Sequence, residues 1–203
     1  NGAVQALTLA AHAGDAGQLY DLVLQPALIG TAADDMALSG AIGVVLHLDE
    51  SGPQQAGLTL NGLTLADRKA RFSLSRTDGS VAWQREDQGN LSSITTQGAS
   101  LLGIQSGPFT AEAVFAADRI VLSQPIVIPV LGGQVALDRF ELDGALVAGD
   151  RPRWSADASV QGVSLQRLTE TLQWPPFNGD LSGTLADTRY QDGVFSVGGG
   201  LQV

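Results

Sequence analysis

Short runs in which apolar and polar residues alternate recur along the whole chain, and glycine or turn residues separate them. The pattern of apolar, polar, apolar and then glycine occurs in 58–62, 142–144 and 181–183. A period of two is typical of strands with one buried face, because successive side chains point to opposite sides of a sheet. The chain therefore predicts an all-β fold of roughly a dozen to sixteen short strands, arranged as an antiparallel meander, sandwich or barrel.

Three local signals refine this expectation. Asn61-Gly62 lies between two alternating runs and predicts a hairpin turn, and Asp78-Gly79 predicts another. The apolar parity flips between Leu137 and Phe140, which predicts a bulge or turn between them. The strands in these regions should therefore be short.

One short helix is expected near the C-terminus. Ser164 is a suitable N-cap, and the apolar residues Leu165, Leu168 and Leu172 recur on one helical face. The prolines after Trp174 end the helix. A helix this short must pack on an apolar surface, so its leucines should cap one edge of the sheet.

Composition bounds the functional classes. The 203 residues carry a net charge of −10, with 44% hydrophobic but only 5% aromatic residues, and no cysteine. Few and scattered cations disfavour nucleic acid and a polybasic grip on anionic lipid. The longest uncharged apolar stretch, 120–137, contains prolines and glycines that disfavour a membrane helix. We expect one β-rich domain over 1–203, as a fragment of a longer protein.

The sequence offers little catalytic or metal-binding chemistry. Its two histidines, His12 and His47, lie on separate predicted strands, and without cysteine a zinc site is disfavoured. The acidic pairs Asp34-Asp35 and Asp49-Glu50 could bind calcium or act as acid and base, but they fit solvated turns as well. We expect no enzyme activity and no cofactor.

The last third of the chain, 133–203, resembles the C-terminal part of the YdbH-like proteins, in the AsmA and TamB group of Gram-negative envelope proteins. The resemblance rests on several short pieces in the same order and spacing. They are 131–137 (LGGQVAL), 153–156 (RWSA), 162–165 (GVSL), 174–177 (WPPF), 181–185 (LSGTL) and 190–193 (YQDG).

This resemblance implies a curved, twisted antiparallel sheet that forms an open groove. It also implies a non-enzymatic role, in which an apolar concave face shields phospholipid acyl chains across the periplasm. The protein would be anchored to the inner membrane outside this fragment, with envelope proteins of either membrane as possible partners. From strand parity we expect the groove to be lined by Leu58, Leu60, Phe72, Leu74, Val81, Trp83, Val135, Leu137, Leu181, Leu185, Phe195 and Val197.

Two other classes compete with this interpretation. A closed β-sandwich for adhesion or carbohydrate binding predicts a filled core and a site of exposed aromatic residues. An enzyme on a β-scaffold predicts two carboxylates that meet in a cleft. Alternating leucines most often form an ordinary core, so the apolar face alone does not separate a groove from a sandwich.

Overall fold

The computed structural model describes residues 6–21, 25, 35–86, 89–144 and 152–203. In these ranges the chain is almost entirely β-structure, with two short helices. The strands are β1 (Ala6–Ala13), β2 (Met36–Asp49), β3 (Gly52–Asp67), β4 (Phe72–Gln84), β5 (Leu91–Leu101), β6 (Ile104–Gln105), β7 (Phe109–Ala116), β8 (Arg119–Leu122), β9 (Ile126–Val130), β10 (Gly133–Asp143), β11 (Arg153–Ser164), β12 (Asp180–Gln191) and β13 (Val194–Gln202). The helices are α1 (Ala16–Leu19) and α3 (Leu165–Leu172).

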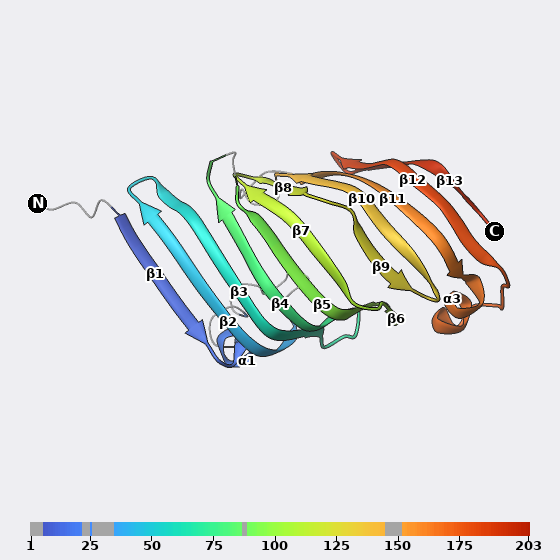
Figure 1. The fold of residues 1–203 in the computed structure, drawn as a ribbon, viewed down its shortest axis with the longest axis horizontal. Helices are drawn as coiled ribbons and strands as arrows, with labels where there is room; N and C mark the ends of the chain where they lie inside the picture. The colour runs from blue at the N-terminus through green and yellow to red at the C-terminus, as the bar shows by residue number, and fades with distance from the viewer. Residues whose placement is uncertain (1–5, 22–24, 26–34, 87–88, 145–151) are drawn as a thin grey trace, which may run out of the picture.

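All thirteen strands belong to one open sheet, which confirms the predicted fold class. The hydrogen-bonded order is β1-β2-β3-β4-β5-β7-β8-β10-β11-β12-β13, while β6 pairs with β5 and β9 with β10. Every pairing is antiparallel except a short parallel contact between β4 and β7. The sheet is a long curved meander from β1 at one edge to β13 at the other (Figure 1). Both helices lie at the same end of the strands, since α1 follows β1 and α3 follows β11.

The two predicted hairpin turns are wrong, because both signals lie inside long strands. Asn61-Gly62 falls within β3, where the register shifts between Leu60 and Leu63 and Gly62 has φ 58°. The backbone N–H of Gly62 donates to Asp78 Oδ1 at 2.6 Å, and Asp78 itself lies within β4. A positive φ serves a β-bulge as well as a hairpin turn, so the bend occurs without reversing the chain.

Two other local predictions are confirmed. The register of β10 against β11 shifts between Leu137 and Arg139, which is the predicted bulge. Helix α3 begins after Ser164, whose side chain accepts from the backbone N–H of Arg167 at 3.4 Å. The helix ends at Gln173, which adopts a left-handed conformation with φ 56°.

The buried core is small and lies near α1. Ile42, Leu60 and Leu63 pack with Ala16 of the helix, and each is less than a tenth exposed. The accessible surface of the chain is 12228 Å², whereas a compact monomer of this length would expose about 9,000 Å². The excess follows from the architecture, because the described strands form a single sheet with no second layer of described residues over it.

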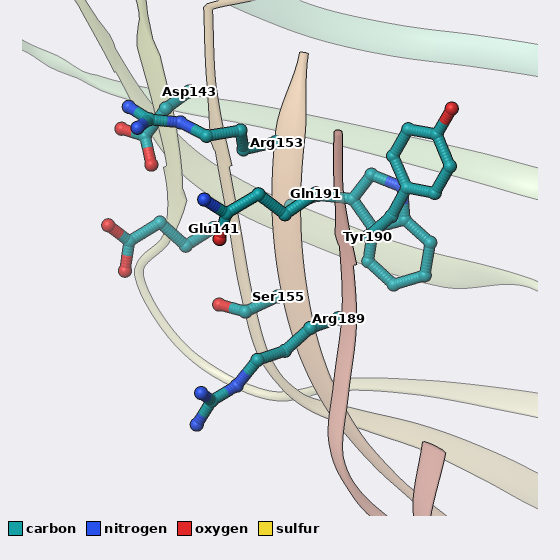
Figure 2. A pocket seen from close by; sticks show the side chains of 8 residues that line it. Glu141, Asp143, Arg153, Ser155, Arg189, Tyr190 and Gln191 are labelled. Carbon is teal, nitrogen blue, oxygen red and sulfur yellow. The ribbon is translucent and has the colours of Figure 1, made fainter. Parts of the chain in front are cut away.

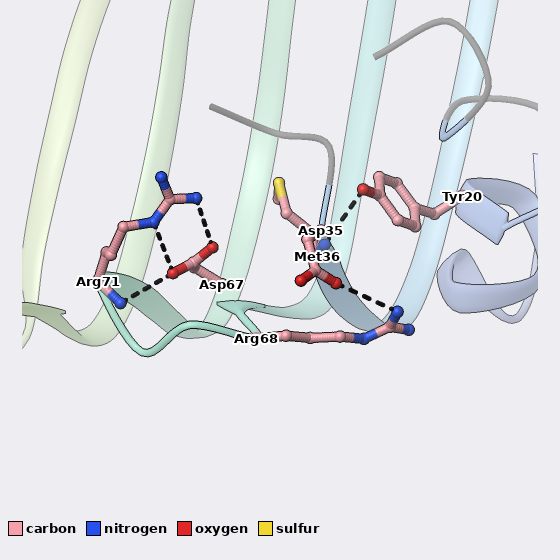
Figure 3. A network of polar contacts seen from close by, with 6 residues as sticks. All are labelled: Tyr20, Asp35, Met36, Asp67, Arg68 and Arg71. Carbon is pink, nitrogen blue, oxygen red and sulfur yellow. Dashed lines mark hydrogen bonds and ion pairs between the residues drawn. The ribbon is translucent and has the colours of Figure 1, made fainter. Parts of the chain in front are cut away.

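A network of polar contacts lies at the strand ends beside α1 (Figure 3). Asp67 is fully buried and accepts from Arg71 through its backbone N–H at 2.9 Å and through the guanidinium at 2.7 Å. The Arg71 guanidinium holds the pKa of Asp67 at about 2. Nearby, the backbone N–H of Met36 donates to the hydroxyl of the buried Tyr20 at 3.1 Å.

Candidate functional site

One face of the sheet carries an unbroken row of apolar side chains from edge to edge. Residues directly opposite each other on paired strands point to the same face, so the register shows which side chains are neighbours. We call this row, which lies close to the strand ends opposite the helices, the rim row. Its members in strand order are Leu9, Leu46, Ala56, Trp83, Phe115, Ile120, Leu142, Trp154, Tyr190 and Phe195.

Further apolar rows lie on the same face, on the helix side of the rim row. One crosses the first half of the sheet, and another crosses the second half. The first is Ala13, Ile42, Leu60, Gly79, Ile94 and Ala111. The second is Ile126, Leu137, Ala158, Leu185 and Gly199. We call the face that carries these rows the apolar face, and the opposite one the polar face.

All twelve residues predicted to line a groove lie on the apolar face. Leu58 pairs with Val81, and Leu60 and Trp83 share their parity. Leu74 pairs with Leu65, two residues from Phe72 along β4. The remaining six are Val135, Leu137, Leu181, Leu185, Phe195 and Val197, which β10, β12 and β13 place on the same side.

The twelve residues differ in how far the protein covers them. Leu60 is only 8% exposed because it packs beneath α1, so it belongs to the small core. Val81, Trp83, Val135 and Leu137, in the middle of the sheet, are half-buried. At the β13 edge Phe195 is 59% exposed. Most of the face is therefore not covered by the described part of the chain.

The three leucines of α3 are half-buried at the ends of the strands. Leu165, Leu168 and Leu172 share one helical face, while the buried Thr169 donates to the carbonyl of Gln166 at 3.0 Å. The helix contacts β6. At its first residue, the backbone N–H of Leu165 donates to the carbonyl of Gly179 at 3.0 Å. The helix thus lies at the ends of the strands, and the role of its leucines as a cap on one edge of the sheet stays a prediction.

Sequence reasoning missed most of the rim row. Trp154 stacks on Tyr190 with ring centroids 6.3 Å apart, and its ring centroid lies 5.8 Å from that of Phe195. Trp83 donates through Nε1 to the carbonyl of Ala117 at 2.7 Å. The available signal was position: Tyr190 directly precedes the turn residues 191–193, so it had to lie near a strand end.

The polar face carries hydroxyl and amide side chains together with exposed ion pairs. One of its rows is Thr59, Ser80, Ser93 and Glu112. Arg139 pairs with Asp157 at 2.7 Å, and this contact lowers the pKa of Asp157. A second group of ion pairs on the polar face joins Arg119 with Glu141 and Asp143.

An open depression of ≈ 340 Å³ lies among charged residues of β10, β11 and β12. Figure 2 shows Tyr190 on the other side of the strands from Glu141 and Arg189. The same three strands therefore present charge on one face and aromatic rings on the other.

Among the described residues, the acidic and histidine candidates do not converge. Asp49 accepts from the backbone N–H and hydroxyl of Ser51 at 2.7 and 2.6 Å, and these bonds lower its pKa, as expected for a turn carboxylate. Asp34 lies outside the described residues. His47 contacts the hydroxyl of Thr8 through Nδ1 at 2.9 Å. Within the described ranges, no three ligating side chains cluster as a metal site would require.

Among the described residues, neither helix has the length and apolar character needed to cross a membrane. Comparisons of the chain with protein-family models, with curated proteins and with solved structures found no match.

Proposed function

We propose that the apolar face binds acyl chains of phospholipid, and that the protein is a non-enzymatic lipid carrier segment. The observation that carries the proposal is the continuous apolar face, which crosses all the main strands and is left largely uncovered by the described residues. An apolar sheet face is normally covered by a second layer of secondary structure. The described residues leave this face exposed, so it is available to an external partner.

The chemistry of the face suits a hydrocarbon chain. It consists mainly of Leu, Val, Ile, Ala and a few aromatic rings, with Gly at several row positions. Such a surface packs against methylene groups without specific polar contacts, and burial contributes about 0.8 kcal/mol per CH₂ group. Transport of phospholipid across the periplasm is the setting suggested by the resemblance of 133–203 to the YdbH-like proteins.

The proposal is tested by paired substitutions that place the same charge on opposite faces. Leu137→Asp puts a carboxylate on the apolar face, and Ala136→Asp puts one on the polar face of the same strand, where Ala136 pairs with Ser159. We expect Leu137→Asp to weaken binding of a phospholipid with a fluorescent acyl chain by about tenfold, a loss of about 1.4 kcal/mol. Ala136→Asp should bind as the unchanged protein does.

A second pair in the other half of the sheet checks the result. Val81→Asp and Ser80→Asp differ in the same way within β4. Equal binding by both members of each pair would refute the proposal. Loss of folding in Leu137→Asp and Val81→Asp, measured by circular dichroism, would show that these positions belong to a core.

A further inference from the structure

We infer that bound phospholipid has a fixed orientation on the apolar face, with its ester and headgroup region at the rim row and its acyl chains directed toward the helix end. This inference rests on the proposed function and adds the position of each part of the lipid. It is carried by the placement of the amphipathic aromatic residues.

Trp and Tyr are confined to one row of the sheet. The chain has three Trp and two Tyr, of which Trp83, Trp154 and Tyr190 lie in strands. All three belong to the rim row, and each is one residue from the end of its strand. Trp174 and Tyr20 lie outside the strands.

This placement matches the boundary between hydrocarbon and water. Indole and phenol rings have an apolar body and a polar group, so they are favoured where one side is apolar and the other is wet. The strands end one or a few residues beyond the row, and the terminal residues Arg119, Asp143 and Arg153 belong to the polar face, so water lies next to the row. The rows on the helix side are instead aliphatic, as Ile126, Leu137 and Leu185 illustrate.

The dimensions of the face are compatible with this orientation. Leu137 and the rim-row residue Leu142 lie opposite Ala158 and Trp154, which are four positions apart on β11, and this corresponds to about 13 Å along a strand. The hydrocarbon of one membrane leaflet is of similar depth, about 15 Å, half of the bilayer core. A chain whose ester lies at the rim row would therefore end near the level of Leu137.

Tryptophan quenching by brominated phosphatidylcholine measures this depth directly. Two lipids are used, one with bromine near the carboxyl end of the acyl chain and one with bromine near the methyl end. Trp174→Phe is combined with Trp154→Phe to leave Trp83, or with Trp83→Phe to leave Trp154. The matched deep reporter is Leu137→Trp in a protein whose three Trp are replaced by Phe. If the Leu137→Trp substitution prevents folding, Leu185→Trp in the same background replaces it.

The inference expects opposite orders of quenching at the two depths. Trp83 and Trp154 should lose more fluorescence with bromine near the carboxyl end, and the deep reporter should lose more with bromine near the methyl end. The same order at both depths, or the reverse of the expected orders, overturns the orientation while leaving acyl-chain binding in place. No quenching by either lipid at any position overturns acyl-chain binding itself.

Discussion

At the scale of single residues, glycine in the strands marks close approaches between backbones. Gly79 has φ 141°, and a Cβ added there would overlap the carbonyl oxygen of Ser93 and lie 2.8 Å from Ile94 Cα. Gly79 lies opposite Leu60 on β3 and Ile94 on β5, so both neighbouring strands approach it. An inserted methyl group would force the strands apart.

We therefore expect Gly79→Ala to lower the free energy of unfolding by about 1–3 kcal/mol, measured by urea denaturation. Gly57→Ala is the matched control on β3, since a Cβ there meets only the Val45 side chain at 4.0 Å. That change should have little effect. Equal stability of the two variants would show that the strand approach at Gly79 is looser than described.

The buried carboxylate of Asp67 predicts a pH dependence. Its pKa in the folded protein is about 2, chiefly because of the hydrogen bond from Arg71, against an ordinary value of 3.8. A lowered folded pKa means that the stabilising contribution is complete above the ordinary value and is lost as the pH falls through the folded one. The contribution should therefore disappear between about pH 4 and pH 2.

The measurement is the difference in urea midpoint between the unchanged protein and Asp67→Asn across this range. The difference isolates Asp67 from other carboxylates, such as Asp157, whose pKa is also lowered. The gap between the two proteins should narrow as the pH approaches 2. A difference in midpoint that is constant with pH would mean that the contact with Arg71 does not lower the pKa of Asp67.

At the scale of elements, α3 depends on its N-cap. Ser164→Ala removes the acceptor for the Arg167 N–H and should destabilise the helix by about 1 kcal/mol, or about fivefold in local opening. Hydrogen exchange of the α3 amides measures the change, and Ser196→Ala, on the exposed edge strand β13, serves as control. Unchanged exchange in Ser164→Ala would show that packing of the leucine face, rather than the cap, holds the helix.

Elements governed by local chemistry could be predicted from the sequence. Alternation indicated the strands, Ser164 and the leucine spacing indicated α3, and the parity flip indicated the bulge after Leu137. Asn61-Gly62 misled because its positive φ fits a hairpin and a bulge alike. Helix α1 spans only four residues, too few for a helical period to show.

The candidate site was predictable only in part, for a physical reason. Parity within each strand identified which of its residues share the apolar side, because alternation is local, and the pairing of strands then placed all twelve groove residues on one face. The rim row joins residues from ten strands, so it depends on register between strands far apart in sequence, such as Trp83 beside Phe115. Burial of Leu60 by α1 is also a tertiary contact. Neither property is encoded in one strand's pattern.

At the scale of the whole molecule, the single sheet has two consequences. Its apolar face lacks a second layer over most of the described residues, which is the basis of the proposed acyl-chain site. Its edge strands β1 and β13 carry exposed apolar side chains, with Leu9 50% and Val197 51% exposed. Because open edges pair readily with other strands, lipid binding should be measured on protein confirmed as monomeric by light scattering.

Native mass spectrometry of the protein purified without detergent, followed by lipid extraction, tests the central claim most directly. We predict a species heavier than the chain by the mass of phospholipid, retained in Ala136→Asp and strongly reduced in Leu137→Asp. The unliganded mass alone, unchanged after incubation with phosphatidylethanolamine vesicles, would contradict the assignment of the apolar face as an acyl-chain site.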